Sequence, residues 1–316
     1  MKKKIIALGM SISITTSIAF ANPIDPRVIS QESSFFKKTK TLTPITLIRK
    51  GVGKNNVVQG LTLDNQNQVL YSLNVTGNPE KGVLNRFKIS NQFIWTALDA
   101  QKPSPYIGHQ GISFDALSQT IYSSAGSAVE NKGWHIVQFK YQKNRLPENI
   151  NIIRVFNDAY NKNLNTMPSI SPDGKLLVVR GKQGKYNVIR TYNFNQVRNQ
   201  KDLTSSFVKE WKVDLDLTEN GQPFQAMTTD GKYVYMLSGK GDHAPKRLYI
   251  YTIDGQLVQK VNNVQLGLAQ AKLMGTGQLW EPEGLAIDTK RKQLIFMYAV
   301  GDSKQRKAHL YSVDIH

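Results

Sequence analysis

The sequence predicts an all-β fold, a five-bladed β-propeller closed by an N-terminal strand. A short segment that ends in aspartate occurs five times, and successive aspartates lie 51, 58, 57 and 58 residues apart. Every copy is followed by a polar turn and then by apolar strands. This repetition is typical of propellers, whose blades are four-stranded sheets arranged around a central channel.

The repeated segments are the expected first strands of the blades. They are Gln59–Asp64, Gln110–Asp115, Pro168–Asp173, Gln225–Asp230 and Glu283–Asp288. After each polar turn comes a second strand, rich in aromatic and branched residues, which indicates a β-hairpin. The second strands are Val69–Leu73, Thr120–Ser123, Leu176–Val179, Tyr233–Leu237 and Leu294–Tyr298. An alternating third strand follows in every unit, and a weaker outer strand completes each of the first four blades.

The fifth blade ends after its third strand, so its outer strand must come from elsewhere in the chain. The apolar, alternating segment Thr43–Arg49 precedes the first blade and is expected to supply it. Closing the ring in this way removes free sheet edges that would otherwise invite aggregation. We therefore assign residues 43–316 to the propeller and residues 22–42 to a polar leader.

The first 21 residues have the pattern of a cleavable secretory signal. Three lysines are followed by an apolar run of small residues and by the segment Ala19-Phe20-Ala21. This run is shorter and less apolar than a membrane span, so cleavage after Ala21 is expected. The sequence thus predicts a protein of the periplasm or the extracellular space, with no membrane span.

The net positive charge of the chain indicates which classes of partner to expect. The full chain carries a formal net charge of +18, and removing the signal leaves +15. Such a charge favours encounters with polyanions of a cell envelope rather than with nucleic acid. Because the basic residues are scattered, an ordinary solvated surface is an equally valid interpretation. The chain has no cysteine, so stability must come from burial, and we expect a monomer.

Corresponding positions of a propeller meet around its channel, so residues at the starts of the first strands should form a ring. The residues with ligand-binding potential at this mouth are Gln59, His109, Gln110, Gln225, Glu281 and Glu283, with Thr166 and Met167 in blade three. Three interpretations are open. The groups could serve structural hydrogen bonds, bind a sugar or phosphate polymer, or hold a divalent cation such as calcium.

Several motifs around these residues resemble a known family. Val58-Gln59-Gly60-Leu61, Gly108-His109-Gln110-Gly111, Phe224-Gln225-Ala226-Met227 and Glu281-Pro282-Glu283-Gly284-Leu285 are similar to blade starts of helveticin J-type class III bacteriocins. The teichoic-acid biosynthesis protein C family and certain phage receptor-binding proteins share that five-bladed fold. The resemblance implies recognition of a bacterial surface glycopolymer, in some members with antibacterial activity. The third blade start, residues 167–174, departs from the pattern and is common to many propellers.

The sequence therefore predicts a secreted propeller that binds an anionic or sugar-rich envelope polymer, with a bacteriocin-like role as the form that the resemblance implies. One alternative is a metal-assisted phosphoesterase or lactonase that uses His109, Glu281 and Glu283, since Glu-Gly-Leu-Ala also occurs in hydrolytic propellers. Another is a scaffold for envelope proteins. No catalytic residue, dedicated metal motif or nucleotide-binding motif is evident.

Overall fold

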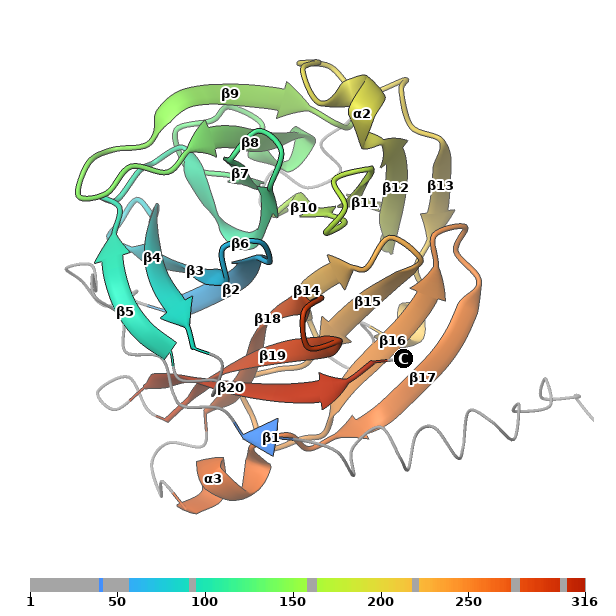
Figure 1. Ribbon diagram of the computed structural model, residues 1–316. Helices are drawn as coiled ribbons and strands as arrows, with labels where there is room; N and C mark the ends of the chain where they lie inside the picture. The colour runs from blue at the N-terminus through green and yellow to red at the C-terminus, as the bar shows by residue number, and fades with distance from the viewer. Residues whose placement is uncertain are drawn as a thin grey trace, which may run out of the picture.

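The computed structural model describes residues 40–41, 57–90, 95–157, 164–217, 222–273, 279–301 and 306–315. Within these ranges, five four-stranded antiparallel sheets form a ring, which confirms the predicted five-bladed β-propeller (Figure 1). The predicted signal, residues 1–21, and nearly all of the predicted leader lie outside the described residues. In the described part of the chain, no helix is long and apolar enough to cross a membrane.

Each sheet is one blade, and its strands are numbered from the channel outward in the first four blades. Blade one contains β2 (Val57–Asp64), β3 (Val69–Thr76), β4 (Lys81–Ile89) and β5 (Trp95–Ala100). Blade two contains β6 (Ile107–Asp115), β7 (Thr120–Ala125), β8 (His135–Lys140) and β9 (Glu148–Arg154). Blade three contains β10 (Met167–Ile170), β11 (Leu176–Gln183), β12 (Tyr186–Asn193) and β13 (Lys209–Lys212).

Blades four and five complete the ring. Blade four contains β14 (Phe224–Thr229), β15 (Tyr233–Ser238), β16 (Lys246–Thr252) and β17 (Leu257–Val264). Blade five contains β18 (Trp280–Asp288), β19 (Gln293–Val300), β20 (Lys307–Asp314) and β1 (Lys40–Thr41). Short helices lie in the connections: η1 (Lys132–Trp134), α2 (Phe194–Val197), η2 (Leu215–Leu217) and α3 (Leu268–Leu273).

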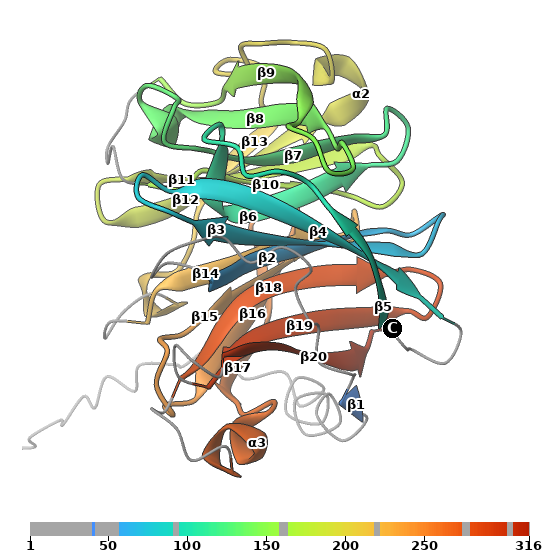
Figure 2. The same cartoon turned by 90° about the vertical axis from the view of Figure 1, so that its left-hand side faces the viewer.

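The ring closes in blade five by a strand from the N-terminal side of the chain, as predicted. In Figure 2, β1 lies beside β20, and Lys40 and Thr41 pair with Ser312 and Tyr311. The pairing described for this strand involves Lys40 and Thr41, and the predicted segment Thr43–Arg49 lies outside the described residues. Two chain segments from opposite ends of the sequence thus share one sheet.

The hydrophobic core consists of five clusters, and each cluster fills the space between two neighbouring blades. Between blades three and four, for example, Val178 and Ile189 pack with Val234 and Met236, all of them fully buried. The other four clusters occupy the equivalent spaces around the ring. Apolar side chains, including those of the first strands, therefore hold the blades to one another, and the polar ring residues lie near the starts of the first strands.

Candidate binding site at the channel mouth

Most of the predicted ring residues lie at irregularities in the first strands of their blades, whereas Glu281 and Met167 are paired with Ala299 and Arg180. In β2, β14 and β18, pairing with the second strand skips Gln59, Gln225 and Glu283. In β6 it skips residues 108–111, which include His109 and Gln110. A bulge bends a strand and re-aims its extra side chain. Because the bulges recur at the same place in the blades, they direct amide and carboxyl groups toward one end of the channel.

Three of these side chains form a continuous hydrogen-bonded chain across the mouth. Gln110 Nε2 donates to Gln225 Oε1 at 2.5 Å, and Gln225 Nε2 donates to Glu281 Oε1 at 2.9 Å. Gln225 Nε2 also lies 3.0 Å from the carbonyl oxygen of Gly239. Blades two and four are not neighbours in the ring, so their side chains meet only by reaching across the channel. The structure thus brings Gln110, Gln225 and Glu281 together, as the repeat pattern predicts.

A second pair lies at the seam between blades one and five. Gln59 is 5% and Glu283 1% exposed, and Gln59 Nε2 is 3.5 Å from Glu283 Oε1. Among the described residues, neither Gln59 Oε1 nor Glu283 Oε2 has a hydrogen-bond partner. Burial raises the pKa of Glu283 well above its usual value, the charge of Glu281 adds to the rise, and Arg306 opposes it. The mouth therefore favours a neutral, protonated Glu283.

His109 belongs to the same segment but contacts a different partner. Its Nδ1 lies 2.9 Å from Glu80 Oε2, on the turn between β3 and β4, and both side chains are about one third exposed. The contact described for His109 does not join it to Glu281 or Glu283, with which the sequence groups it. Within the described ranges, no three His, Asp or Glu side chains are close enough together to hold a metal ion.

Among the described residues at the start of the first strand, blade three contributes no polar side chain to the ring. Thr166 is fully buried, and its hydroxyl donates to the carbonyl oxygen of Gly133 at 2.5 Å. Met167 is also buried and packs against Gly111, which has a φ of +80°. A Cβ atom at Gly111 would lie 2.8 Å from the Met167 Cβ, so blades two and three approach this closely only because residue 111 is glycine.

The loop beside Glu281 is held by a buried lysine that the sequence analysis did not identify. Lys246 Nζ donates to the carbonyl oxygens of Lys240 and Asp242, at 2.6 and 2.7 Å, and to Asp242 Oδ1 at 3.1 Å. It also lies 4.5 Å from the ring centroid of Trp280, which is fully buried. Burial lowers the pKa of Lys246, while Asp242 opposes the shift. Lys246 thus fixes the loop that forms one wall of the mouth.

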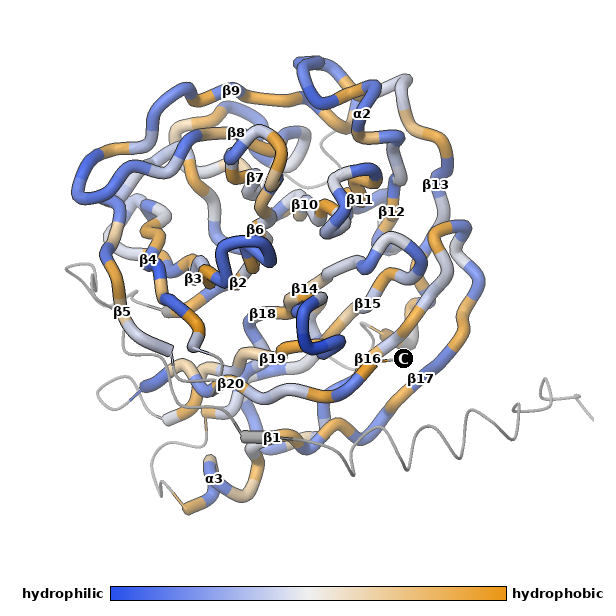
Figure 3. Tube along the Cα trace, viewed as in Figure 1, coloured by the Kyte–Doolittle hydropathy of each residue, from blue (hydrophilic) through white to orange (hydrophobic). Residues whose placement is uncertain are grey.

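The opposite end of the channel has a different chemistry. The first strands enclose a cavity there, lined from all five blades by apolar and hydroxyl side chains that include Leu61, Ile112, Ile170, Thr228 and Leu285. Figure 3 shows that the loops joining β2 to β3 and β18 to β19, at this end, are hydrophilic. The two ends of the channel are therefore distinct surfaces, a hydrogen-bonding mouth and a cavity of mixed apolar, hydroxyl and amide lining beside polar turns.

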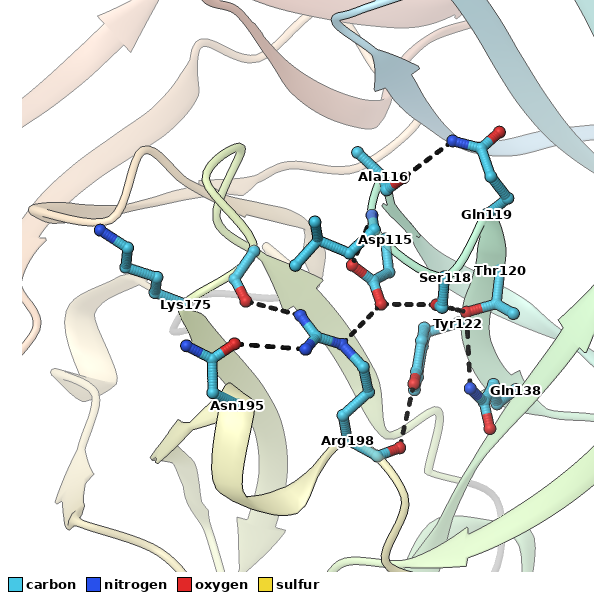
Figure 4. A network of polar contacts seen from close by, with 12 residues as sticks. Asp115, Ala116, Ser118, Gln119, Thr120, Tyr122, Gln138, Lys175, Asn195 and Arg198 are labelled. Atoms are coloured by element: carbon cyan, nitrogen blue, oxygen red, sulfur yellow. Dashed lines mark hydrogen bonds and ion pairs between the residues drawn. The ribbon is translucent and has the colours of Figure 1, made fainter.

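The repeated aspartates hold these turns, and one of them, Asp115, also links two neighbouring blades. Figure 4 shows Asp115, which is fully buried, at the centre of such a network. Its Oδ2 accepts hydrogen bonds from Ser118 Oγ at 2.6 Å and from Arg198 Nε at 2.8 Å, and Arg198 also donates to the Gly174 carbonyl oxygen. Arg198 thereby ties blade three to the first hairpin of blade two. The motif aspartates are structural rather than part of the mouth.

Comparisons with known proteins relate this chain to a family of phage propeller domains. The family model for the phage five-bladed β-propeller receptor-binding platform domain matches residues 57–312. The tail fibre of Staphylococcus aureus phage P68 is similar in structure, with a TM-score of 0.64 and 17% identity over 91% of this chain. The chain spans 56% of the length of that tail fibre. No curated protein matches the sequence.

Two further solved structures have lower scores. Glutaminyl cyclase from Myxococcus xanthus has a TM-score of 0.49 and 11% identity, covering 88% of this chain and 97% of the enzyme. TolB from Acinetobacter baumannii has a TM-score of 0.40 and 13% identity, covering 82% of this chain and 56% of TolB.

Proposed function

Because the chain belongs to the family of phage five-bladed β-propeller receptor-binding platform domains, we propose that it binds a receptor on a cell surface. The observation that carries the proposal is the chain of side chains across the channel mouth, from Gln110 through Gln225 to Glu281. The tail fibre of Staphylococcus aureus phage P68 shares the fold, which agrees with the family assignment. The proposed function is recognition rather than catalysis.

The chemistry of the mouth favours a ligand rich in hydroxyl groups. Each glutamine amide offers two donors and a carbonyl acceptor, and a protonated Glu283 offers one donor and one acceptor. Glu281 is partly exposed and can accept hydrogen bonds from solvent or ligand. The net charge of +18 adds a long-range attraction to anionic polymers. The proposed receptor is therefore an anionic or sugar-rich polymer of a bacterial envelope.

The resemblance to helveticin J-type bacteriocins extends the proposal to an antibacterial role. In that form, the exported protein acts outside the cell that makes it, and polymer recognition selects the target bacterium. Growth inhibition by the purified protein, compared between strains with and without the recognised polymer, tests this extension separately from binding.

A binding panel tests the proposed function. The purified protein is assayed against teichoic acids, lipopolysaccharide and acidic capsule at low and high salt, with Gln110→Ala and Glu281→Ala as mouth variants. The control is Gln256→Ala, an exposed glutamine on the turn before β17. We expect one polymer class to bind, binding to weaken with salt, and both mouth variants to lose at least about tenfold in affinity, the effect of about 1.4 kcal/mol.

Two outcomes of the panel contradict the proposal. One is the absence of binding to every polymer, and the other is binding that both mouth variants retain in full. A parallel series with a chelator tests the calcium prediction. Polymer binding that is lost with the chelator and restored by added calcium would place a cation in the site.

A further inference from the structure

Blade three contains two buried arginines whose surroundings differ in one respect. Arg180 in β11 and Arg190 in β12 are each 7% exposed. Arg190 Nε lies 2.6 Å from Glu210 Oε2, so its charge is paired. Among the described residues, no carboxylate lies within ion-pair distance of Arg180. The two arginines are thus equally buried, and among the described residues only Arg190 has a carboxylate partner.

Every hydrogen bond described for Arg180 goes to a neutral oxygen. Nε and Nη2 donate to Asn187 Oδ1, at 2.8 and 2.6 Å, and Nη1 donates to the carbonyl oxygen of Asn165 at 3.0 Å. These bonds use three of the five N–H groups of the guanidinium. For the other two, the described part of the chain provides no acceptor. The guanidinium group of Arg180 is therefore held in place, and two of its N–H donors have no acceptor among the described residues.

The charge of Arg180 is costly to bury. Burial lowers its pKa to about 9, which still leaves the guanidinium protonated at neutral pH. Removing a charge from water without a counter-ion costs several kcal/mol in general, and neutral hydrogen bonds offset only part of that cost. Costs of this kind are concentrated at sites that bind ligands, where the missing partner arrives with the ligand.

Arg180 lies at the mouth end of the channel, between blades three and four. It is opposite Met167 in the β10–β11 pairing, and its guanidinium carbon is 4.8 Å from the ring centroid of Phe224. Phe224 directly precedes Gln225 of the hydrogen-bonded chain across the mouth. Close to Arg180, Asn165 Oδ1 is buried and has no partner among the described residues. Two groups that lack partners among the described residues therefore lie beside the candidate site: the Arg180 guanidinium, which has no counter-ion, and Asn165 Oδ1, which accepts no hydrogen bond.

We propose that Arg180 is the anion-recognition residue of this protein, and that it binds a phosphate or carboxylate group of the receptor polymer. The inference rests on the proposed function, which it deepens by naming the charged group that is recognised. A guanidinium fork matches two oxygens of either anion, and such charge-assisted bonds are stronger than neutral ones. Asn165 Oδ1 can accept a hydrogen bond from a neighbouring hydroxyl of the same polymer.

This assignment divides recognition between two parts of the mouth. The amides of Gln110 and Gln225, together with Glu281, contact hydroxyl groups, while Arg180 contacts the anionic group. Glu281 and Glu283 belong to blade five, so the carboxyl groups and the proposed anion site lie on different blades. A polymer that alternates hydroxyl-rich units with anionic groups fits this arrangement better than a neutral glycan does.

The direct test monitors Arg180 itself. Arginine Nε–H and Nη–H signals of the wild-type protein are followed by NMR during titration with inorganic phosphate or with glucuronate, at ionic strength matched with chloride. Arg180→Lys assigns the signal. We expect a saturable shift at the Nη–H groups of Arg180, two of which lack an acceptor among the described residues, and none at Arg190, whose guanidinium is paired with Glu210. The anion that produces the shift identifies whether phosphate or carboxylate is preferred. No shift with either anion overturns the assignment.

Measurements of polymer binding distinguish a failure of the proposed anion site from a failure of the proposed function. Arg180→Gln is compared with Arg190→Gln after both are checked for folding by circular dichroism. We expect the first variant to lose at least about tenfold in affinity for the anionic polymer, and the control to lose less than about threefold. If wild type binds polymer and Arg180→Gln binds equally well, the anion site is wrong and the function stands. If phosphate shifts Arg180 but no polymer binds, the function fails and the site stands.

Discussion

Gln59 and Glu283 face each other across the seam between blades one and five, with 3.5 Å between Gln59 Nε2 and Glu283 Oε1. The remaining oxygen of each side chain is buried and unpartnered among the described residues. A single proton on Glu283 accounts for both oxygens, because the acid hydroxyl can donate to Gln59 Oε1 while the amide donates to the acid carbonyl. The raised pKa of Glu283 agrees with this pairing.

The first prediction concerns pH. Burial raises the folded-state pKa of Glu283 above 4.5, whereas the unfolded chain titrates near that value. The stability associated with this proton is complete below pH 4.5 and is lost as pH rises toward the folded-state pKa, by about 1.4 kcal/mol for each unit of pKa difference. Urea unfolding between pH 4 and pH 9 measures this decline.

Glu283→Gln should remove that part of the decline, because the amide supplies the donor permanently. Its free energy of unfolding, relative to wild type, is expected to increase from pH 4 to pH 9. Glu148→Gln, at an exposed carboxylate of β9, is the control and should show no such trend. Parallel pH profiles for wild type and Glu283→Gln would show that Glu283 does not hold the proton.

Gln225→Ala should destabilise the propeller, because it removes the partner of both Gln110 and Glu281. A buried polar group left without its partner costs about 1 to 3 kcal/mol. Thermal unfolding measures the loss, and Gln256→Ala, on an exposed turn, should stay within about 0.5 kcal/mol of wild type. Equal stability of the two variants would mean that the chain of contacts across the mouth contributes nothing.

Lys246→Met should release the loop of residues 240–242 while keeping an apolar contact with Trp280. The carbonyl oxygens of Lys240 and Asp242 lose a charged donor, with an expected cost of about 1 to 3 kcal/mol. Hydrogen exchange should accelerate at the amides of Lys240 and Ala244, which donate to Gln222 and Asp242. Lys260→Met, at a lysine of the outer strand β17, is the comparison and should leave exchange in that loop unchanged. Unaltered exchange in Lys246→Met would contradict the assigned role.

Arg198→Met should cost about 3 to 5 kcal/mol, because it leaves the buried carboxylate of Asp115 without its cation. The matched control is Lys175→Met, whose partner Asp173 is exposed and 3.8 Å away, and its cost should be below about 1 kcal/mol. Chemical denaturation of both variants tests the contrast. Similar losses in the two would show that burial does not distinguish these ion pairs.

The repeat pattern alone was sufficient to predict the blade number and most of the mouth. In a propeller, equal offsets from a repeated residue become equal positions around an axis, so Gln110, Gln225 and Glu281 could be placed together without coordinates. For the closing strand, Lys40 and Thr41 pair with β20, whereas the segment predicted to supply it, Thr43–Arg49, lies outside the described residues and stays a prediction.

Other features depend on contacts between distant segments and leave no local signal. His109 meets Glu80 through the packing of blade one against blade two. Lys246 begins a strand whose sequence is compatible with an exposed lysine, and only the adjacent loop makes it buried. Arg180 and Arg190 occupy similar alternating strands, so the presence of Glu210 beside one of them is visible only in the folded chain.

The bulges of β2, β14 and β18 have a consequence for how this protein can change. Gln59, Gln225 and Glu283 stand outside the ladder of paired residues, so exchanging them leaves the hairpins that support the blades intact. The proposed binding preference can therefore change at these bulge positions while the strand pairing of the blades is kept, although the contacts across the mouth must then be replaced. Diversification at these positions offers a direct route to propellers with new binding preferences.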